Sequence, residues 1–198
     1  MKDQRKLNNI VRYLERQRLP YEVARASFNP ETSMAIVIPC YFERELEKTL
    51  KSLEACDQPT RHYEVVIVLN ASDVASEEVK EFHREQHAWL NTKLFAFPVH
   101  TILLEDINPK KAGVGLARKI GMDYALEGLS ENHGLDGVIV CLDGDCLVER
   151  NYLKEIEKRT NGELTFKWFH GGTLVKAPQT VEGLKSGLVD LVVTTGLF

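Results

Sequence analysis

The sequence predicts an α/β fold in which a mostly parallel sheet is flanked by helices. Two observations support this prediction. Short apolar runs such as Met34–Ile38 and Val65–Leu69 lack the alternation of a half-exposed strand, which is typical of strands buried on both faces. Segments with apolar residues at helical spacing separate these runs, and such strand–helix repetition is typical of a parallel sheet covered by helices.

The expected elements follow one another along the chain, and Pro39 is expected to stop the first strand. In order they are a strand at Met34–Ile38, a helix at Glu43–Ala55, a strand at Val65–Leu69, a helix at Val74–Leu90, a strand at Thr101–Leu104, a helix at Val114–Leu126, a strand at Val138–Leu142 and a helix at Tyr152–Lys158. Beyond residue 162 the pattern is weaker and predicts strands at Leu164–Phe169 and Leu188–Val193, with a turn at Gly171–Gly172 between them.

A basic amphipathic helix is expected over the first eighteen residues, and Pro20 ends it. We assign residues 1–33 to an N-terminal helical extension and residues 34–198 to the α/β domain. One interpretation of the helix is peripheral association with the inner face of a membrane. The other packs it against its own domain with the basic side chains in water. We favour the second because the apolar stripe consists of only Leu7, Ile10, Val11 and Leu14.

The composition is that of an ordinary globular protein, with 43% hydrophobic and 27% charged residues. A net charge of −4 gives no reason to expect a nucleic-acid partner. We see neither an apolar run of membrane-spanning length nor a signal peptide, so we expect a cytoplasmic protein. The four cysteines do not form a disulfide framework, and buried free thiols are the simplest interpretation.

The strongest motif is a pair of carboxylates at the end of a predicted strand. The apolar run from Val138 leads directly into Asp143 and Asp145, with Gly144 between them. Two carboxylates this close repel each other without a cation, and carboxylate oxygens suit Mg²⁺ or Mn²⁺. Gly144 permits a tight turn and the close approach of a ligand. The alternative is a simple turn before the next helix, and the spacing alone does not decide between the two.

A second stretch, Lys111–Gly121, places glycines at the start of a helix. Gly113 and Gly115 leave the first backbone amides open to an anion, and Arg118 follows one turn later. Taken alone this signal is weak, because such glycines usually serve the turn. Neither the P-loop sequence nor the dinucleotide-binding fingerprint is present.

The third stretch follows the first predicted strand. Tyr41 can stack on a nucleobase or lie partly buried at the sheet edge, and Glu43 can accept a hydrogen bond or cap the next helix. His83 and His87 lie four residues apart on a predicted helix. Because no third metal ligand is near them in the sequence, we interpret them as part of a solvated helix face.

Together these stretches resemble the family 2 glycosyltransferases, which have the Rossmann-like GT-A fold. The order and spacing of the motifs agree over Ala35–Lys158, the nucleotide-sugar binding portion of that family. The matching positions are Pro39, Tyr41 and Glu43 in the first motif, Lys111, Gly113, Ala117, Arg118, Lys119 and Gly121 in the second, and Leu142, Asp143, Asp145, Tyr152 and Leu153 in the third.

The resemblance implies transfer of a sugar from a nucleoside diphosphate sugar, with a UDP-sugar expected first, to a hydroxyl of a glycan or lipid-linked acceptor. It implies inversion at the anomeric carbon and dependence on Mn²⁺ or Mg²⁺. Arg118 would contact the nucleotide end of the donor. Tyr41 would lie against the base, and Pro39 would shape the loop beneath it. Asp143 would touch the ribose or the metal, and Asp145 would be a metal ligand. Glu43 is counted with the nucleotide-sugar-binding residues.

Two departures from the family pattern bear on function. The family carries an acidic pair after the second strand, where this chain has Asn70, which can still pair with a base edge. The acceptor segment after Asp145 is short: His170–Gly172 resembles its Gly-Gly turn only loosely, and no general base can be chosen among the acids there, Glu163, Glu182 and Asp190.

Two alternatives stay open, and the short acceptor segment favours the first. The first is a nucleotide-sugar binding module without a complete acceptor site, which would transfer sugar poorly or not at all. The second is a GT-A-like nucleotidyltransferase, which the residues Pro39–Glu43 disfavour because they lack a glycine-rich loop with a basic residue.

Overall fold

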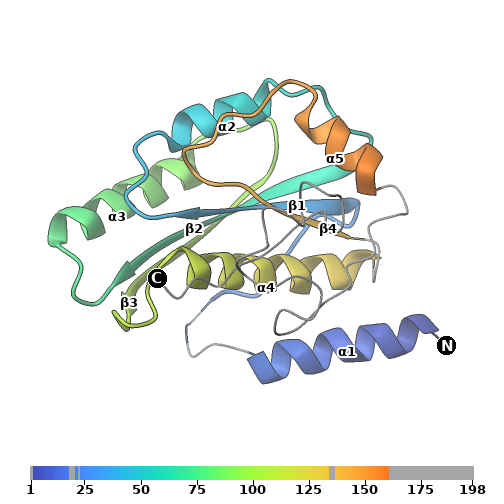
Figure 1. Ribbon diagram of the computed structural model, residues 1–198, viewed down its shortest axis with the longest axis horizontal. Coiled ribbons are helices and arrows are strands. Elements are labelled where there is room, and N and C mark those ends of the chain that lie inside the picture. Colours follow the sequence, from blue (N-terminus) through green and yellow to red (C-terminus); the bar gives the residue numbers. More distant parts are fainter. Residues whose placement is uncertain (1, 18–20, 22, 134–136, 161–198) are drawn as a thin grey trace, which may run out of the picture. The chain divides into compact units, whose positions relative to one another are not determined.

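Four parallel strands form a sheet in the order β3-β2-β1-β4 (Figure 1). Their bounds are β1 Thr32–Cys40, β2 His62–Ser72, β3 Val99–Ile107 and β4 Val138–Cys141. This computed structural model describes residues 2–17, 21, 23–133 and 137–160. The strands and turn predicted beyond residue 162, and the candidate bases there, lie outside the described residues. The predicted fold class, a parallel sheet flanked by helices, is confirmed.

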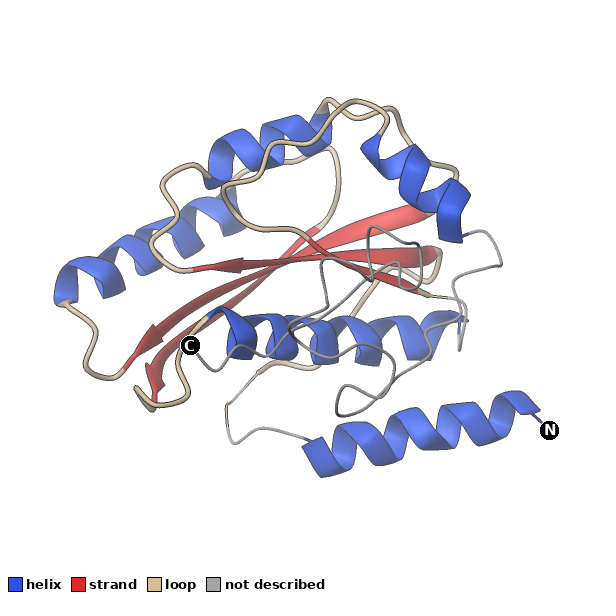
Figure 2. Ribbon diagram, viewed as in Figure 1, coloured by secondary structure: helices blue, strands red, loops and turns tan. Residues whose placement is uncertain are grey.

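Helices cover both faces of the sheet (Figure 2). They are α1 Lys2–Gln17, α2 Leu46–Glu54, α3 Glu77–Thr92, α4 Val114–His133 and α5 Tyr152–Thr160. One core layer joins β1 and β2 to α2, α3 and α5, while the other joins the opposite faces of the same strands to α4. Side chains of β1 therefore alternate between two apolar layers, and all of Met34–Ile38 are fully buried.

α4 lies close against the sheet because Gly121 faces β1 and β2. A Cβ atom at Gly121 would come within 2.4 Å of Val37 Cγ1 and 3.1 Å of Val68 Cγ2. The glycine that matched the second motif of the family pattern is therefore required by packing rather than by contact with a ligand.

Pro39 does not stop the first strand, which continues to Cys40 in the interior of the sheet. The prediction was wrong because it did not include the strand order. Val37 turns its carbonyl toward β4, since it accepts a hydrogen bond from the Leu142 amide at 3.0 Å. Pro39, two residues later, faces the same side beyond the last paired residue of β4, Cys141. A proline there removes no ladder hydrogen bond.

The cysteines are free, as expected, but only two of them are buried. Cys40 and Cys56 lie in the core. Cys141 and Cys146 are exposed, which corrects the expectation of four buried thiols. The reason is that Cys141 ends β4, which has a described neighbour on one side only, and Cys146 lies on the turn that follows.

α1 packs beside α4, as the second interpretation of the N-terminal helix expected (Figure 1). The Tyr13 hydroxyl donates to Asp123 Oδ1 at 3.1 Å, and Lys119 Nζ lies 5.5 Å from the centre of the Tyr13 ring. Among the described helices, none combines the length and apolarity needed to cross a bilayer.

A buried carboxylate, Glu64, ties the amino ends of the strands together. It accepts hydrogen bonds from the Asn29 amide at 2.7 Å and the Thr32 hydroxyl at 2.5 Å, and it contacts His100 Nε2. Burial alone would raise the pKa of Glu64, but the hydrogen bonds from His100, Thr32 and Asn29 outweigh it and hold that pKa below its ordinary value.

We expect Glu64→Gln to lower the free energy of unfolding at pH 7 by about 1–3 kcal/mol, because it weakens hydrogen bonds to a buried charge. The folded pKa lies below the unfolded one, so this stabilisation is present above the ordinary carboxylate range. It is lost as the pH falls through the folded value. Urea unfolding at several pH values measures both effects. Exposed Glu85 provides the control Glu85→Gln. A constant difference between wild type and Glu64→Gln down to pH 3 would contradict the assignment.

Candidate functional site

The predicted site residues gather at the edge of the sheet where the parallel strands end. β2 and β3 lie on one side of β1, and the chain then returns to place β4 on the other side (Figure 1). In open α/β sheets, ligands bind beyond the carboxyl ends of the strands at such a reversal. Tyr41 follows β1, Asn70 lies near the end of β2, Asp143 follows β4, and Arg118 lies in the second turn of α4.

A side chain of α2 holds the turn after β4 by a hydrogen bond. The Thr49 hydroxyl, which is fully buried, donates to the Gly144 carbonyl at 2.7 Å. A Cβ atom at Gly144 would lie 3.1 Å from both Cys40 Sγ and Glu43 Cγ, so the turn packs closely against these two side chains. The backbone of the motif is therefore fixed, while Asp143 and Asp145 themselves point outward and are exposed.

The charges around this turn are unevenly balanced. Arg118 Nη2 donates to Asp143 Oδ1, whereas no ion pair is found for Asp145 within the described part of the chain. Burial raises the pKa of Glu43, and the nearby negative charges of Asp145 and then Asp143 raise it further. Three carboxylates thus share a region in which Arg118 supplies the paired positive charge.

Within the described residues, no group of three or more His, Cys, Asp and Glu is arranged to hold a metal ion. The exposed oxygens of Asp143 and Asp145 are hard ligands, two residues apart on one turn. Mg²⁺ and Mn²⁺ sites commonly use one or two carboxylates and take further ligands from substrate phosphates and water. The donor set is compatible with a cation that is held jointly by protein and ligand.

The loop after β1 presents Tyr41, whose side chain is 54% exposed. The next residue, Phe42, has a φ of 56°, in the left-handed region that non-glycine residues rarely adopt. Its amide donates to His83 Nε2 at 3.0 Å, and Gln86 Nε2 donates to the Glu43 carbonyl at 2.9 Å. Side chains of α3 therefore hold this loop at two successive residues.

His83 is fully buried, so its assignment to a solvated helix face was wrong. The sequence contains a signal for its burial. His83 lies four residues after Val79 and seven before Leu90, which places all three on one face of α3, and all three are buried. His87 is half-buried, and its Nε2 lies 3.2 Å from Nδ2 of Asn91 on the same helix, within hydrogen-bonding distance.

Asn70 is 1% exposed at the end of β2. Its Nδ2 donates to the Gly113 carbonyl at 3.4 Å, which links β2 to the start of α4. Gly113 has a φ of 147°, a conformation that favours glycine. Asn70 Oδ1 is buried and has no hydrogen-bond partner among the described residues. The observed contact is structural, and contact with a base stays a prediction.

The family described as Glycosyl transferase family 2 matches residues 35–162, more than half of the chain and a range that includes all three motifs. The chain belongs to glycosyl transferase family 2. No match was found among curated proteins.

Solved structures similar to the chain include TarS of S. aureus, residues 1–349, at 16% identity and a TM-score of 0.45 over 73% of this chain and 40% of that one. TarS 1–349 in complex with UDP-GlcNAc matches at 14% identity and a TM-score of 0.44, over 73% and 39% of the two chains. This chain thus spans about 40% of the length of those TarS chains.

We expect the hydrogen bond from Thr49 to Gly144 to stabilise the family 2 domain measurably. Thr49→Val keeps the side-chain shape but leaves the buried Gly144 carbonyl unpaired, which should lower the free energy of unfolding by about 1–3 kcal/mol. Thr49→Ser keeps the hydroxyl and should lose less. Urea denaturation compares the two variants. A valine variant as stable as wild type, together with a less stable serine variant, would show that the buried methyl group, not the hydrogen bond, matters.

Proposed function

We propose that this chain binds a nucleoside diphosphate sugar, most simply a UDP-sugar, at the carboxyl edge of its sheet, and that Asp143 and Asp145 hold Mn²⁺ or Mg²⁺ against the diphosphate. In the proposed reaction the sugar passes to a hydroxyl of a glycan or lipid-linked acceptor with inversion. The observation that supports this most directly is the turn at Gly144, whose backbone is fixed by Thr49 while both carboxylates are exposed.

The electrostatics of the site favour a cation together with an anion. Asp143, Asp145 and Glu43 lie close enough for the first two to raise the pKa of the third. When bound, the cation would offset the negative charge that develops on the departing diphosphate. The carboxylates alone would repel a diphosphate, so the proposed donor requires that compensation.

The amino end of α4 offers a second source of positive potential. The helix begins at Val114, and its first turn contains Gly115, where a Cβ atom would meet nothing within 4 Å. Free amides at the start of a long helix favour anions. Arg118, one turn further on, presents its guanidinium beside Asp143 and is 38% exposed, so it can contact a phosphate.

The nucleoside is assigned to Tyr41. An exposed aromatic ring at the end of β1 provides a stacking surface for any base. Asn70 Oδ1, an acceptor without a described partner at the end of the neighbouring strand, has the polarity required to pair with the N–H of uracil. Glu43 lies in the same loop as Tyr41 and is close enough to Asp143 and Asp145 to interact with their charges. When ionised, it would add a negative charge near the cation.

The test of the metal assignment is calorimetric titration with UDP in the presence of Mn²⁺ or of a chelator. We expect binding with Mn²⁺ only. Asp145→Asn should weaken UDP binding at least about 10- to 100-fold, the range found even for outer partners of metal ligands. Because Asp145 is exposed, the variant should stay folded.

The matched control is Asp106→Asn, an exposed carboxylate near the end of β3, whose removal should leave UDP binding unchanged. Equal affinity for UDP with Mn²⁺ and with chelator, or wild-type affinity in folded Asp145→Asn, would refute the metal assignment. Measuring sugar transfer in parallel, with glycan and lipid acceptors, separates donor binding alone from catalysis.

Tyr41 and Arg118 should contribute to different parts of the ligand. Tyr41→Ala should weaken uridine and UDP alike, by roughly 1–3 kcal/mol if the ring stacks on the base. Arg118→Ala should weaken UDP and leave uridine almost unchanged, because the guanidinium faces the carboxylate turn. Titrations of both ligands into both variants test this division. The same loss for uridine and UDP in Arg118→Ala would contradict it.

A further inference from the structure

α3 supplies three side chains that contact the loop after β1, residues Tyr41–Glu43, which we name the β1 loop. The rings of Phe82 and Phe42 lie 4.9 Å apart. His83 and Gln86 hydrogen-bond to the backbone at Phe42 and Glu43, at 3.0 and 2.9 Å. The contacts fall on successive residues of the loop, so they determine its path and not just its distance from the helix.

The hydrogen bond at His83 defines the chemical state of its ring. The Phe42 amide is a donor, so His83 Nε2 must accept, which requires a neutral imidazole with its proton on Nδ1. Burial lowers the pKa of His83 and favours that state. Nδ1 is buried without a hydrogen-bond partner among the described residues. An apolar side chain would avoid this unpaired N–H, so packing alone does not account for histidine here.

The contact of His83 is made to a residue in a strained conformation. A φ of 56° at Phe42 is unfavourable for a residue with a large side chain and persists only where surrounding contacts enforce it. Arg44 adds a further contact, with Cζ 4.8 Å from the centre of the Phe42 ring. The left-handed turn brings Tyr41 to the surface, edge-on to the His83 ring at 6.1 Å and 80°.

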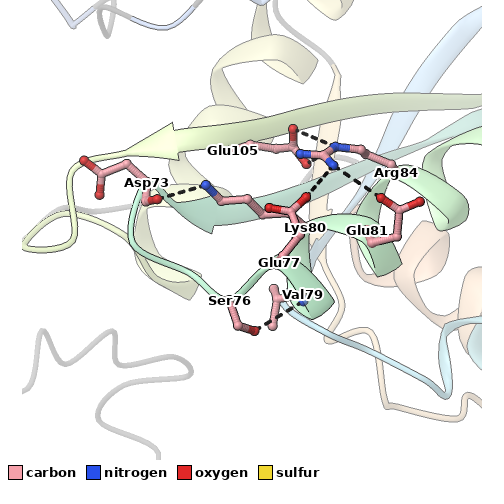
Figure 3. A network of polar contacts seen from close by, with 8 residues as sticks. All are labelled: Asp73, Ser76, Glu77, Val79, Lys80, Glu81, Arg84 and Glu105. Carbon is pink, nitrogen blue, oxygen red and sulfur yellow. Dashed lines mark hydrogen bonds and ion pairs between the residues drawn. The ribbon is translucent and has the colours of Figure 1, made fainter.

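The position of His83 is set by the sheet and not by the loop that it holds. Figure 3 shows how the amino half of α3 is attached: the Ser76 side chain caps the helix, and Lys80 Nζ donates to the Asp73 carbonyl at 2.9 Å. Arg84, adjacent to His83, pairs with Glu105 of β3 at 3.0 Å. These contacts make α3 a fixed support for the β1 loop.

We propose that His83 is a positioning residue of the nucleoside site. By accepting the Phe42 amide it fixes the left-handed turn that presents Tyr41, and its ring supports one edge of Tyr41 while the remaining surface stays exposed for a base. The inference rests on the proposed function, because its ligand is the nucleoside assigned to Tyr41. The residue acts through Phe42 and Tyr41 and is not itself assigned a contact with the ligand.

The experiment compares His83→Leu with His83→Gln by calorimetric titration of uridine, UDP with Mn²⁺, and inorganic pyrophosphate with Mn²⁺. Leucine removes the acceptor, whereas glutamine places Oε1 near the position of Nε2. We expect His83→Leu to weaken uridine and UDP about tenfold each, a part of what a stacked base contributes. Pyrophosphate binding should be unchanged, and His83→Gln should restore most of the uridine affinity.

Two further variants keep the test decisive. If His83→Leu does not fold, His83→Asn replaces it, because its shorter amide cannot reach the Phe42 amide that glutamine reaches. His87→Leu, on the same helix but without a contact to the β1 loop, should leave uridine binding at the wild-type level. Folded leucine or asparagine variants that bind uridine like wild type would overturn the inference. A wild-type protein that binds neither uridine nor UDP would instead overturn the proposed function on which it rests.

Discussion

The burial of β1 from Met34 to Cys40 is the constraint on which the rest of this structure depends. Its side chains alternate between two apolar layers, and its backbone groups must be paired by β2 on one side and β4 on the other. Where β4 ends at Cys141, that pairing ceases on one side, and a proline becomes acceptable at position 39. The chain then leaves the sheet, and polar side chains gather at the point where the backbone is no longer enclosed.

The residues at this edge divide into those that hold backbone and those that are free to meet a ligand. Thr49, Asn70, His83 and Gln86 each hydrogen-bond to the carbonyl or amide of a residue far away in the sequence, and the first three are fully or almost fully buried. The exposed side chains, Tyr41, Asp143 and Asp145, lie on the turns so fixed. A site built in this way requires little reorganisation when a ligand binds, because the turns are already supported by the two helical layers.

The sequence predicted what depends on local periodicity and on adjacent residues. The strands, the helices and the paired carboxylates after Leu142 are of this kind. The roles of Thr49 and His83 could not be predicted, because each depends on a contact between segments far apart in the sequence. His83 and Phe42 are 41 residues apart, and Thr49 and Gly144 are 95 residues apart. Burial of His83 was foreseeable from its alignment with Val79 and Leu90, but its partner was not. Likewise, the exposure of Cys141 and the tolerance of Pro39 depend on which strand lies next to which, and periodicity does not encode strand order.

The pairing of Arg118 with Asp143 adds a thermodynamic consequence to the proposed function. In the structure the guanidinium offsets one carboxylate, and Asp145 has no ion pair among the described residues. A diphosphate would compete for Arg118 and so leave both carboxylates of the turn in need of a positive charge. A cation at the turn would supply that charge and release Arg118 for the phosphates. On the proposed function, donor and cation therefore each favour the binding of the other, and the coupling must be equal in both directions. On that proposal, Arg118 would be the residue through which the two binding events are linked.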